Sequence, residues 1–207
     1  MTKQMRAVFT IAILGTMFQI GHFAEHAWQW GVWLFGERNK PWMSAVADWL
    51  SMRFGELVHP MPEICGDEKA WMAKQMFYGM EVLHLVGNTI FLVTIAAILF
   101  LITQKINERK AWVTDEPLAK CQKLMKWALA IETFHLYEHI MLTATAFFLD
   151  KPVGFSTLFG ATGLMAKPNA VGTRVTWHFV MNMIPTILMM MGLMPVIKDW
   201  LAKRKTA

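Results

Sequence analysis

Six of the seven histidines of this chain fall in two short motifs, and each motif occurs twice. The pattern HxxEH covers residues 22–26 and 135–139, and the pattern HxxxN covers residues 84–88 and 178–182. Neutral imidazole is a good ligand for Zn, Cu, Fe and Ni, so the repeated pattern predicts a metal centre. The predicted ligands are the six motif histidines, His22, His26, His84, His135, His139 and His178.

The motifs also contain two glutamates and two asparagines. On a helix, residues four apart lie on one face, and a residue three along flanks that face. We therefore expect Glu25 and Glu138 to be catalytic, as bridging ligands, proton carriers or acceptors that orient a histidine. Asn88 and Asn182 follow His84 and His178 by one turn. We expect these two amides to bind a cofactor or to orient a ligand.

Several kinds of site fit this pattern. The first is a mono- or dinuclear transition-metal centre in a redox enzyme or in a subunit of a membrane oxidoreductase. Copper is favoured over iron or zinc, because methionine thioethers occur near the histidines and suit copper. The second is a pair of haem b groups or pigments, each held between histidines of two helices, in an electron-transfer subunit.

Two further readings rank below these. HxxEH is also the inverzincin signature of zinc hydrolysis, although its duplication fits structural repetition better than a single protease site. A non-catalytic scaffold subunit of a membrane complex is the last alternative.

The spacings Glu81-x-x-His84 and Glu132-x-x-His135 also resemble the ferritin-like di-iron bundles, whose ligands include Glu-x-x-His on two helices. The last apolar stretch contains no Glu, which departs from that pattern.

The composition indicates where these residues are held. The chain has 207 residues, 55% hydrophobic and 17% charged, which is less charge than a soluble domain carries. A bilayer-spanning helix needs about 20 apolar residues, and four stretches are long enough, at residues 7–35, 76–102, 127–149 and 175–197. None of them contains Lys, Arg or Asp. We therefore predict an all-α integral membrane protein with four transmembrane helices.

The repeated motifs predict two tandem helical hairpins related by a pseudo-twofold axis. The first hairpin occupies residues 1–103, a cytoplasmic linker residues 104–126, and the second hairpin with a basic tail residues 127–207. Between the first two spans, apolar residues recur at helical spacing, namely Trp42, Val46, Trp49, Leu50, Phe54 and Leu57. This stripe predicts an amphipathic helix on the outer surface.

The net charge of +5 is explained by topology and not by nucleic-acid binding. Lys and Arg concentrate in the N-terminal tail, residues 103–126 and the C-terminal tail, and such segments remain cytoplasmic. Both termini are then cytoplasmic, in a membrane that we expect to be the bacterial inner membrane. All six motif histidines would lie in its outer half. Expected partners are the lipid bilayer and other membrane subunits or further copies of the chain.

Overall fold

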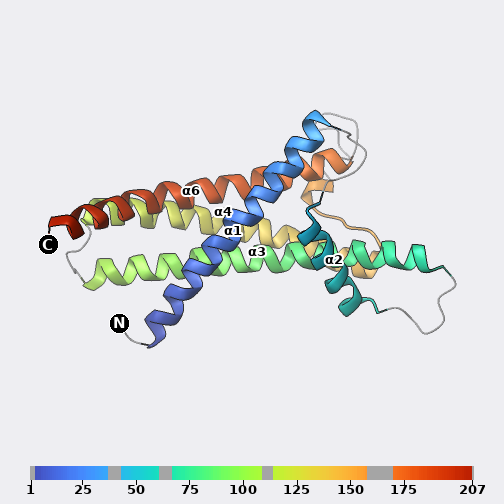
Figure 1. Ribbon diagram of the computed structural model, residues 1–207, viewed down its shortest axis with the longest axis horizontal. Coiled ribbons are helices and arrows are strands. Elements are labelled where there is room, and N and C mark those ends of the chain that lie inside the picture. The colour runs from blue at the N-terminus through green and yellow to red at the C-terminus, as the bar shows by residue number, and fades with distance from the viewer. Residues whose placement is uncertain (1–2, 37–42, 61–66, 109–113, 158–169, 207) are drawn as a thin grey trace. The chain divides into compact units, whose positions relative to one another are not determined.

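The computed structural model describes residues 3–36, 43–60, 67–108, 114–157 and 170–206, and no strand occurs among them. Four long helices and one short helix dominate these residues (Figure 1). They are α1 (Lys3–Phe35), α2 (Ala45–Val58), α3 (Glu68–Glu108), α4 (Asp115–Leu149) and α6 (Ala170–Thr206). The predicted all-α fold is confirmed.

Three of the long helices are apolar enough to cross a membrane. They are α1, α3 over Glu68–Gln104 and α6 over Arg174–Lys203. The remaining predicted span, residues 127–149, lies within α4, where two glutamates and two histidines lower the mean hydropathy. All four of these ionisable side chains are fully buried, namely Glu132, His135, Glu138 and His139. Membrane crossing by α4 therefore stays a prediction.

The chain divides into two compact units. Unit 1 comprises Met1–Phe23, Ile90–Phe134 and Val180–Ala207, and unit 2 comprises Ala24–Thr89 and His135–Phe179. Each long helix contributes one part of its length to unit 1 and the other part to unit 2. Each unit thus takes segments from both predicted hairpins.

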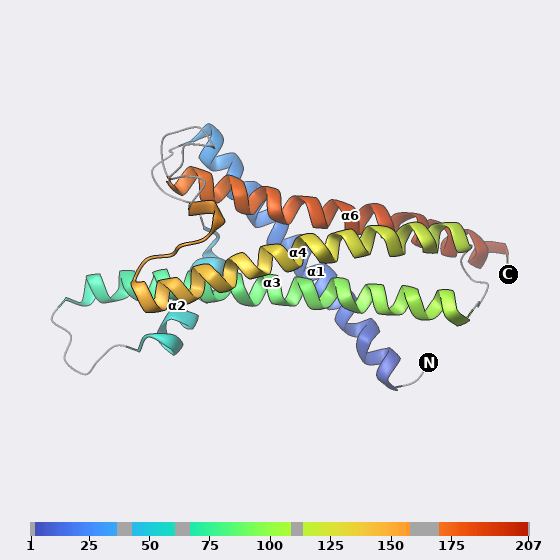
Figure 2. The same cartoon turned by 180° about the vertical axis from the view of Figure 1, so that it is seen from behind.

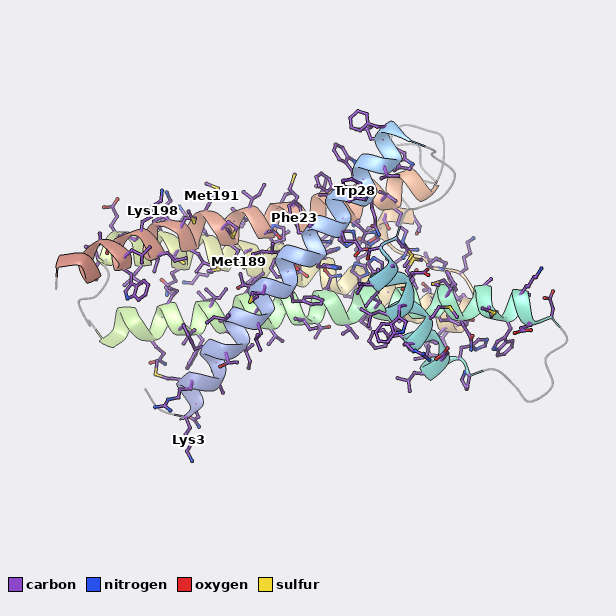
Figure 3. All side chains as sticks on the ribbon, viewed as in Figure 1. Lys3, Phe23, Trp28, Met189, Met191 and Lys198 are labelled. Atoms are coloured by element: carbon purple, nitrogen blue, oxygen red, sulfur yellow. The ribbon has the colours of Figure 1, made fainter. Side chains whose placement is uncertain are left out.

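Unit 1 has an apolar core formed mainly by α3, α4 and α6, whose segments in this unit run side by side (Figure 2), and Ala12 of α1 is buried in the same core. Phe91, Ile95, Met125 and Met189 are completely buried in it. Met189 points into this core, whereas Met191 points away from it and is 51% exposed (Figure 3). Apolar packing therefore holds this unit together.

In unit 2, α2 lies against the N-terminal part of α3 through small residues. A Cβ added at Gly79 would lie 1.7 Å from the Ser51 carbonyl oxygen, so the two backbones touch. A Cβ added at Gly55 would similarly meet the Gln75 carbonyl oxygen. The predicted helix is confirmed over residues 45–58.

Part of the apolar stripe predicted for this helix is exposed. Val46 is 66% exposed, Trp49 57% and Leu57 77%, while Leu50 and Phe54 are half-buried and Trp42 lies outside the described residues. The small residues Ser51 and Gly55 occupy the contact with α3. Anchoring of this stripe at a membrane surface stays a prediction.

Candidate metal centre

Five histidine rings gather inside unit 2. They come from every long helix: His26 from α1, His84 from α3, His135 and His139 from α4, and His178 from α6. Neighbouring rings of this cluster have centroids 4.8–6.1 Å apart. Four of the side chains are buried and His84 is half-buried. The two motif types thus bring five of the six predicted ligands into one cluster.

Three of the five have nitrogen atoms close enough to share one ion. One ring nitrogen from each of His135, His139 and His178 lies within 4.8 Å of the others. The Nε2 atoms of His135 and His139 are 3.1 Å apart. Two nitrogens bound to one zinc-sized ion at about 2.0–2.1 Å each would be separated by a similar distance. This triad therefore has the spacing of a metal site.

The tautomer of His84 follows from its hydrogen bond. Its Nδ1 lies 2.7 Å from the carbonyl oxygen of Met80, one turn earlier on α3. Since a carbonyl can only accept, Nδ1 carries the proton and Nε2 keeps its lone pair. A hydrogen bond from one ring nitrogen to a carbonyl commonly orients a metal-binding histidine, so His84 is prepared to bind an ion through Nε2.

The two motif glutamates have matching partners. The Glu25 carboxylate accepts hydrogen bonds from the Ser44 backbone N–H at 2.9 Å and from the Ser44 hydroxyl at 2.7 Å. The Glu138 carboxylate accepts one from the Ser156 backbone N–H at 2.9 Å. Each serine lies 18 or 19 residues after its glutamate. Both glutamates therefore hold the connection that follows their own helix, and their catalytic role stays a prediction.

The two motif asparagines bind protein groups. Asn88 Nδ2 donates to the His84 carbonyl oxygen at 2.8 Å. Asn182 belongs to unit 1, where its Oδ1 accepts from Gln19 Nε2 at 3.4 Å. Gln19 also donates to the Thr186 hydroxyl at 3.0 Å. The structure therefore gives both amides structural bonds, and binding of a cofactor by either stays a prediction.

The two remaining histidines have contacts with other aromatic rings. His22 belongs to unit 1, where its ring stacks on Phe18 at 5.8 Å, so its role as a ligand stays a prediction. His59 follows α2 and stacks on Trp71 at 4.1 Å. Burial, assisted by the nearby Lys74 ammonium, lowers the pKa of His59.

A buried ion pair beside the cluster was missed from the sequence. Arg174 NH2 lies 2.5 Å and 2.6 Å from the two carboxylate oxygens of Glu81, and the Glu81 side chain is fully buried. Arg174 precedes the last predicted span by one residue, so it counted as a loop cation. The sequence spacing could have indicated this pair, because Glu81 lies three residues before His84 and Arg174 lies four residues before His178. Both pairs therefore share helix faces.

Comparison with protein families yields one match. A family of unknown function, DUF6008, matches residues 1–206, so the chain belongs to this family. No curated protein and no solved structure matches the chain.

Proposed function

We propose that this DUF6008 member is an integral membrane protein that binds a transition-metal ion through the histidine cluster of unit 2. The ligands proposed first are His135, His139 and His178. One observation carries the proposal: their nitrogen atoms lie within 4.8 Å of one another although two helices supply them.

The hydrogen bonding of His139 supports this assignment. Its Nε2 faces His135, while its Nδ1 is buried and has no hydrogen-bond partner among the described residues. Buried polar atoms in proteins are nearly always satisfied. An interhelical hydrogen-bond network, the plainest alternative, would use both ring nitrogens. Coordination of an ion instead employs several imidazoles at once and gives a reason to retain costly polar groups in apolar helices.

The ring packing supports a bare ion over haem b. A haem needs two facing imidazoles with an open slab between them for the porphyrin. The His84 and His139 rings are nearly parallel, with centroids 5.5 Å apart. The His178 ring, however, lies 5.4 Å from the first and 4.8 Å from the second, beside their midpoint. A porphyrin placed there would collide with His178.

The donor set is compatible with a redox role, which we propose for the bound ion. All cluster ligands are imidazoles, which suit copper, iron and zinc, and we place copper first. A bound copper or iron ion would supply one-electron chemistry. The chain would hold the ion and exclude water, while another membrane subunit or a further copy supplies or accepts electrons. On the topology proposed from charge, with cytoplasmic termini, the site lies toward the outer face. A non-catalytic scaffold remains the alternative if no ion binds.

Metal analysis and an absorption spectrum of the purified protein test the proposal. We expect at least one copper, iron or zinc ion per chain and no Soret band. The variant His139→Ala should weaken metal binding at least about tenfold, since even loss of an outer-shell partner costs 10–100-fold. The matched control is His59→Ala, which removes an imidazole of unit 2 outside the cluster. Equal metal affinity in both variants would contradict the proposal, and a Soret band would select haem. The variant His22→Ala decides whether the sixth motif histidine is also a ligand.

A further inference from the structure

The histidine cluster contains more imidazoles than one ion requires. Catalytic zinc sites use three protein ligands, and His135, His139 and His178 already form such a set. His26 and His84 are then left over, although their rings contact the same cluster. We propose that unit 2 binds a second metal ion between His26 and His84, with His178 shared by the two ions. This inference rests on the proposed function.

The second triangle of rings resembles the first. His26, His84 and His178 have pairwise centroid separations of 5.5, 5.4 and 6.1 Å. His135, His139 and His178 have separations of 4.8, 4.8 and 5.9 Å. His178 belongs to both triangles. Measured between ring centroids, the second triangle is thus slightly wider than the first, whose nitrogen atoms lie within 4.8 Å of one another.

Two residues have the chemistry that the second position needs. His84 keeps the lone pair of Nε2, because Met80 accepts the Nδ1 proton. His178 has two ring nitrogens, and an imidazole binds two ions when its N–H proton is released to solvent. The two positions then draw on different helices: α4 and α6 for the first, and α1, α3 and α6 for the second.

The charges of unit 2 also accommodate two cations. The Glu81 carboxylate is neutralised by Arg174, which lies 2.5 Å away. Glu25 and Glu138 have serine hydrogen bonds but no ion pair among the described residues. Two carboxylates without a cation lower the cost of placing two positive ions in an apolar interior.

A copper titration tests the second position. The purified chain is loaded with Cu(II), washed with a weak chelator and analysed for bound copper. We expect two ions per chain in the wild type and in the control His59→Ala. We expect one ion in His26→Ala and one in His135→Ala, because each substitution removes a ligand of only one position. Electron paramagnetic resonance should count fewer spins than copper ions in the wild type, since a shared imidazole couples the two ions.

The outcomes separate this inference from the proposed function. One copper per chain in the wild type, unchanged in His26→Ala, would overturn the second position and leave the first. No bound copper, iron or zinc would overturn the proposed function itself. Two coppers with a full spin count would overturn the sharing of His178. If His26→Ala does not fold, the wild-type copper content and spin count still decide the question.

Discussion

Unit 1 and unit 2 are built from different parts of the same long helices, and their buried side chains differ in kind. Unit 1 packs Phe91, Ile95, Met125 and Met189 into one apolar core. Unit 2 instead buries most of the histidine cluster together with Glu81, Glu138 and Asn88. Polar interiors in apolar helices cost free energy and commonly mark function. Unit 1 also buries polar groups, namely Gln19, Glu132 and Asn182, so the cluster of imidazoles is what distinguishes unit 2, and the substitutions below test that difference.

The largest effect is expected in unit 2, from Arg174→Ala. This change leaves Glu81 buried without its cation, and breaking a buried ion pair costs about 3–5 kcal/mol. Unfolding in detergent, followed by tryptophan fluorescence, measures the loss. The control replaces both partners by apolar residues, as in Glu81→Leu with Arg174→Met, and should retain most of the stability. An Arg174→Ala protein as stable as the wild type would show that the pair has no structural role.

The apolar core of unit 1 should respond to loss of volume. Met189 is fully buried, and Met→Ala substitutions in cores cost about 2–5 kcal/mol. We expect the loss of unfolding free energy in Met189→Ala to lie near the lower end of that range. The amount of bound metal should be unchanged. The control Met191→Ala, at a half-exposed position, should change stability by less than about 0.5 kcal/mol. Loss of metal in Met189→Ala would break the division between the units.

Two glycine substitutions compare a close contact at Gly79 in unit 2 with open space at Gly21 in unit 1. Gly79→Ala would drive a methyl group into the Ser51 carbonyl, and overpacking of this kind costs about 1–3 kcal/mol. A Cβ added at Gly21 would meet no atom within 4 Å among the described residues. Gly21→Ala should therefore stabilise α1 by about 0.5–1 kcal/mol. Thermal unfolding of both variants checks the opposite signs, and a stabilised Gly79→Ala would contradict the contact between α2 and α3.

The smallest effect concerns pH at the edge of unit 2. Asp150 accepts a hydrogen bond from Tyr78 and lies 3.0 Å from Lys74 Nζ. The Tyr78 hydrogen bond, followed by that of Lys74, lowers the pKa of Asp150 below its ordinary value of 3.8. Its stabilising contribution is therefore present above that value and is lost as the pH falls through the lowered pKa.

Unfolding temperatures measured between pH 6 and pH 3 test this contribution. The variant Asp150→Asn should flatten the acid branch slightly, because the side chain is 62% exposed and solvent screens the pair. Identical acid branches in the wild type and in Asp150→Asn would contradict the assigned role of Asp150.

Local periodicity predicted much of this molecule. The helices and three apolar spans follow from composition and length, and i, i+4 spacing placed His135 and His139 on one face. Spacing along one helix does not determine which helices meet, so the sequence could not show that five of the six predicted ligands, and not all six, gather in one cluster. His22 and His26 share a face, yet they belong to different compact units.

Two features depended on tertiary packing that the sequence pattern could not reveal. For α2, the apolar stripe predicted a helix on an outer surface, but only the close approach between Ser51 and Gly79 shows which side of that helix packs on α3. For Arg174, a position just before an apolar stretch is typical of a surface cation. In the structure Arg174 instead forms an ion pair with the buried Glu81 of α3. In both cases a partner far along the chain decides the environment of the residue.

The matched serine bonds of Glu25 and Glu138 have a practical consequence. Each glutamate directly precedes a cluster histidine, His26 or His139. Its carboxylate accepts a hydrogen bond from a serine in the segment that follows its helix. A metal ion bound by the imidazoles would attract the carboxylate oxygens of Glu25 and Glu138. The hydrogen bonds from Ser44 and Ser156 to these oxygens would then weaken. Limited proteolysis near Ser44 and Ser156 should then report occupancy of the interior in crude membranes, without purification or a chromophore.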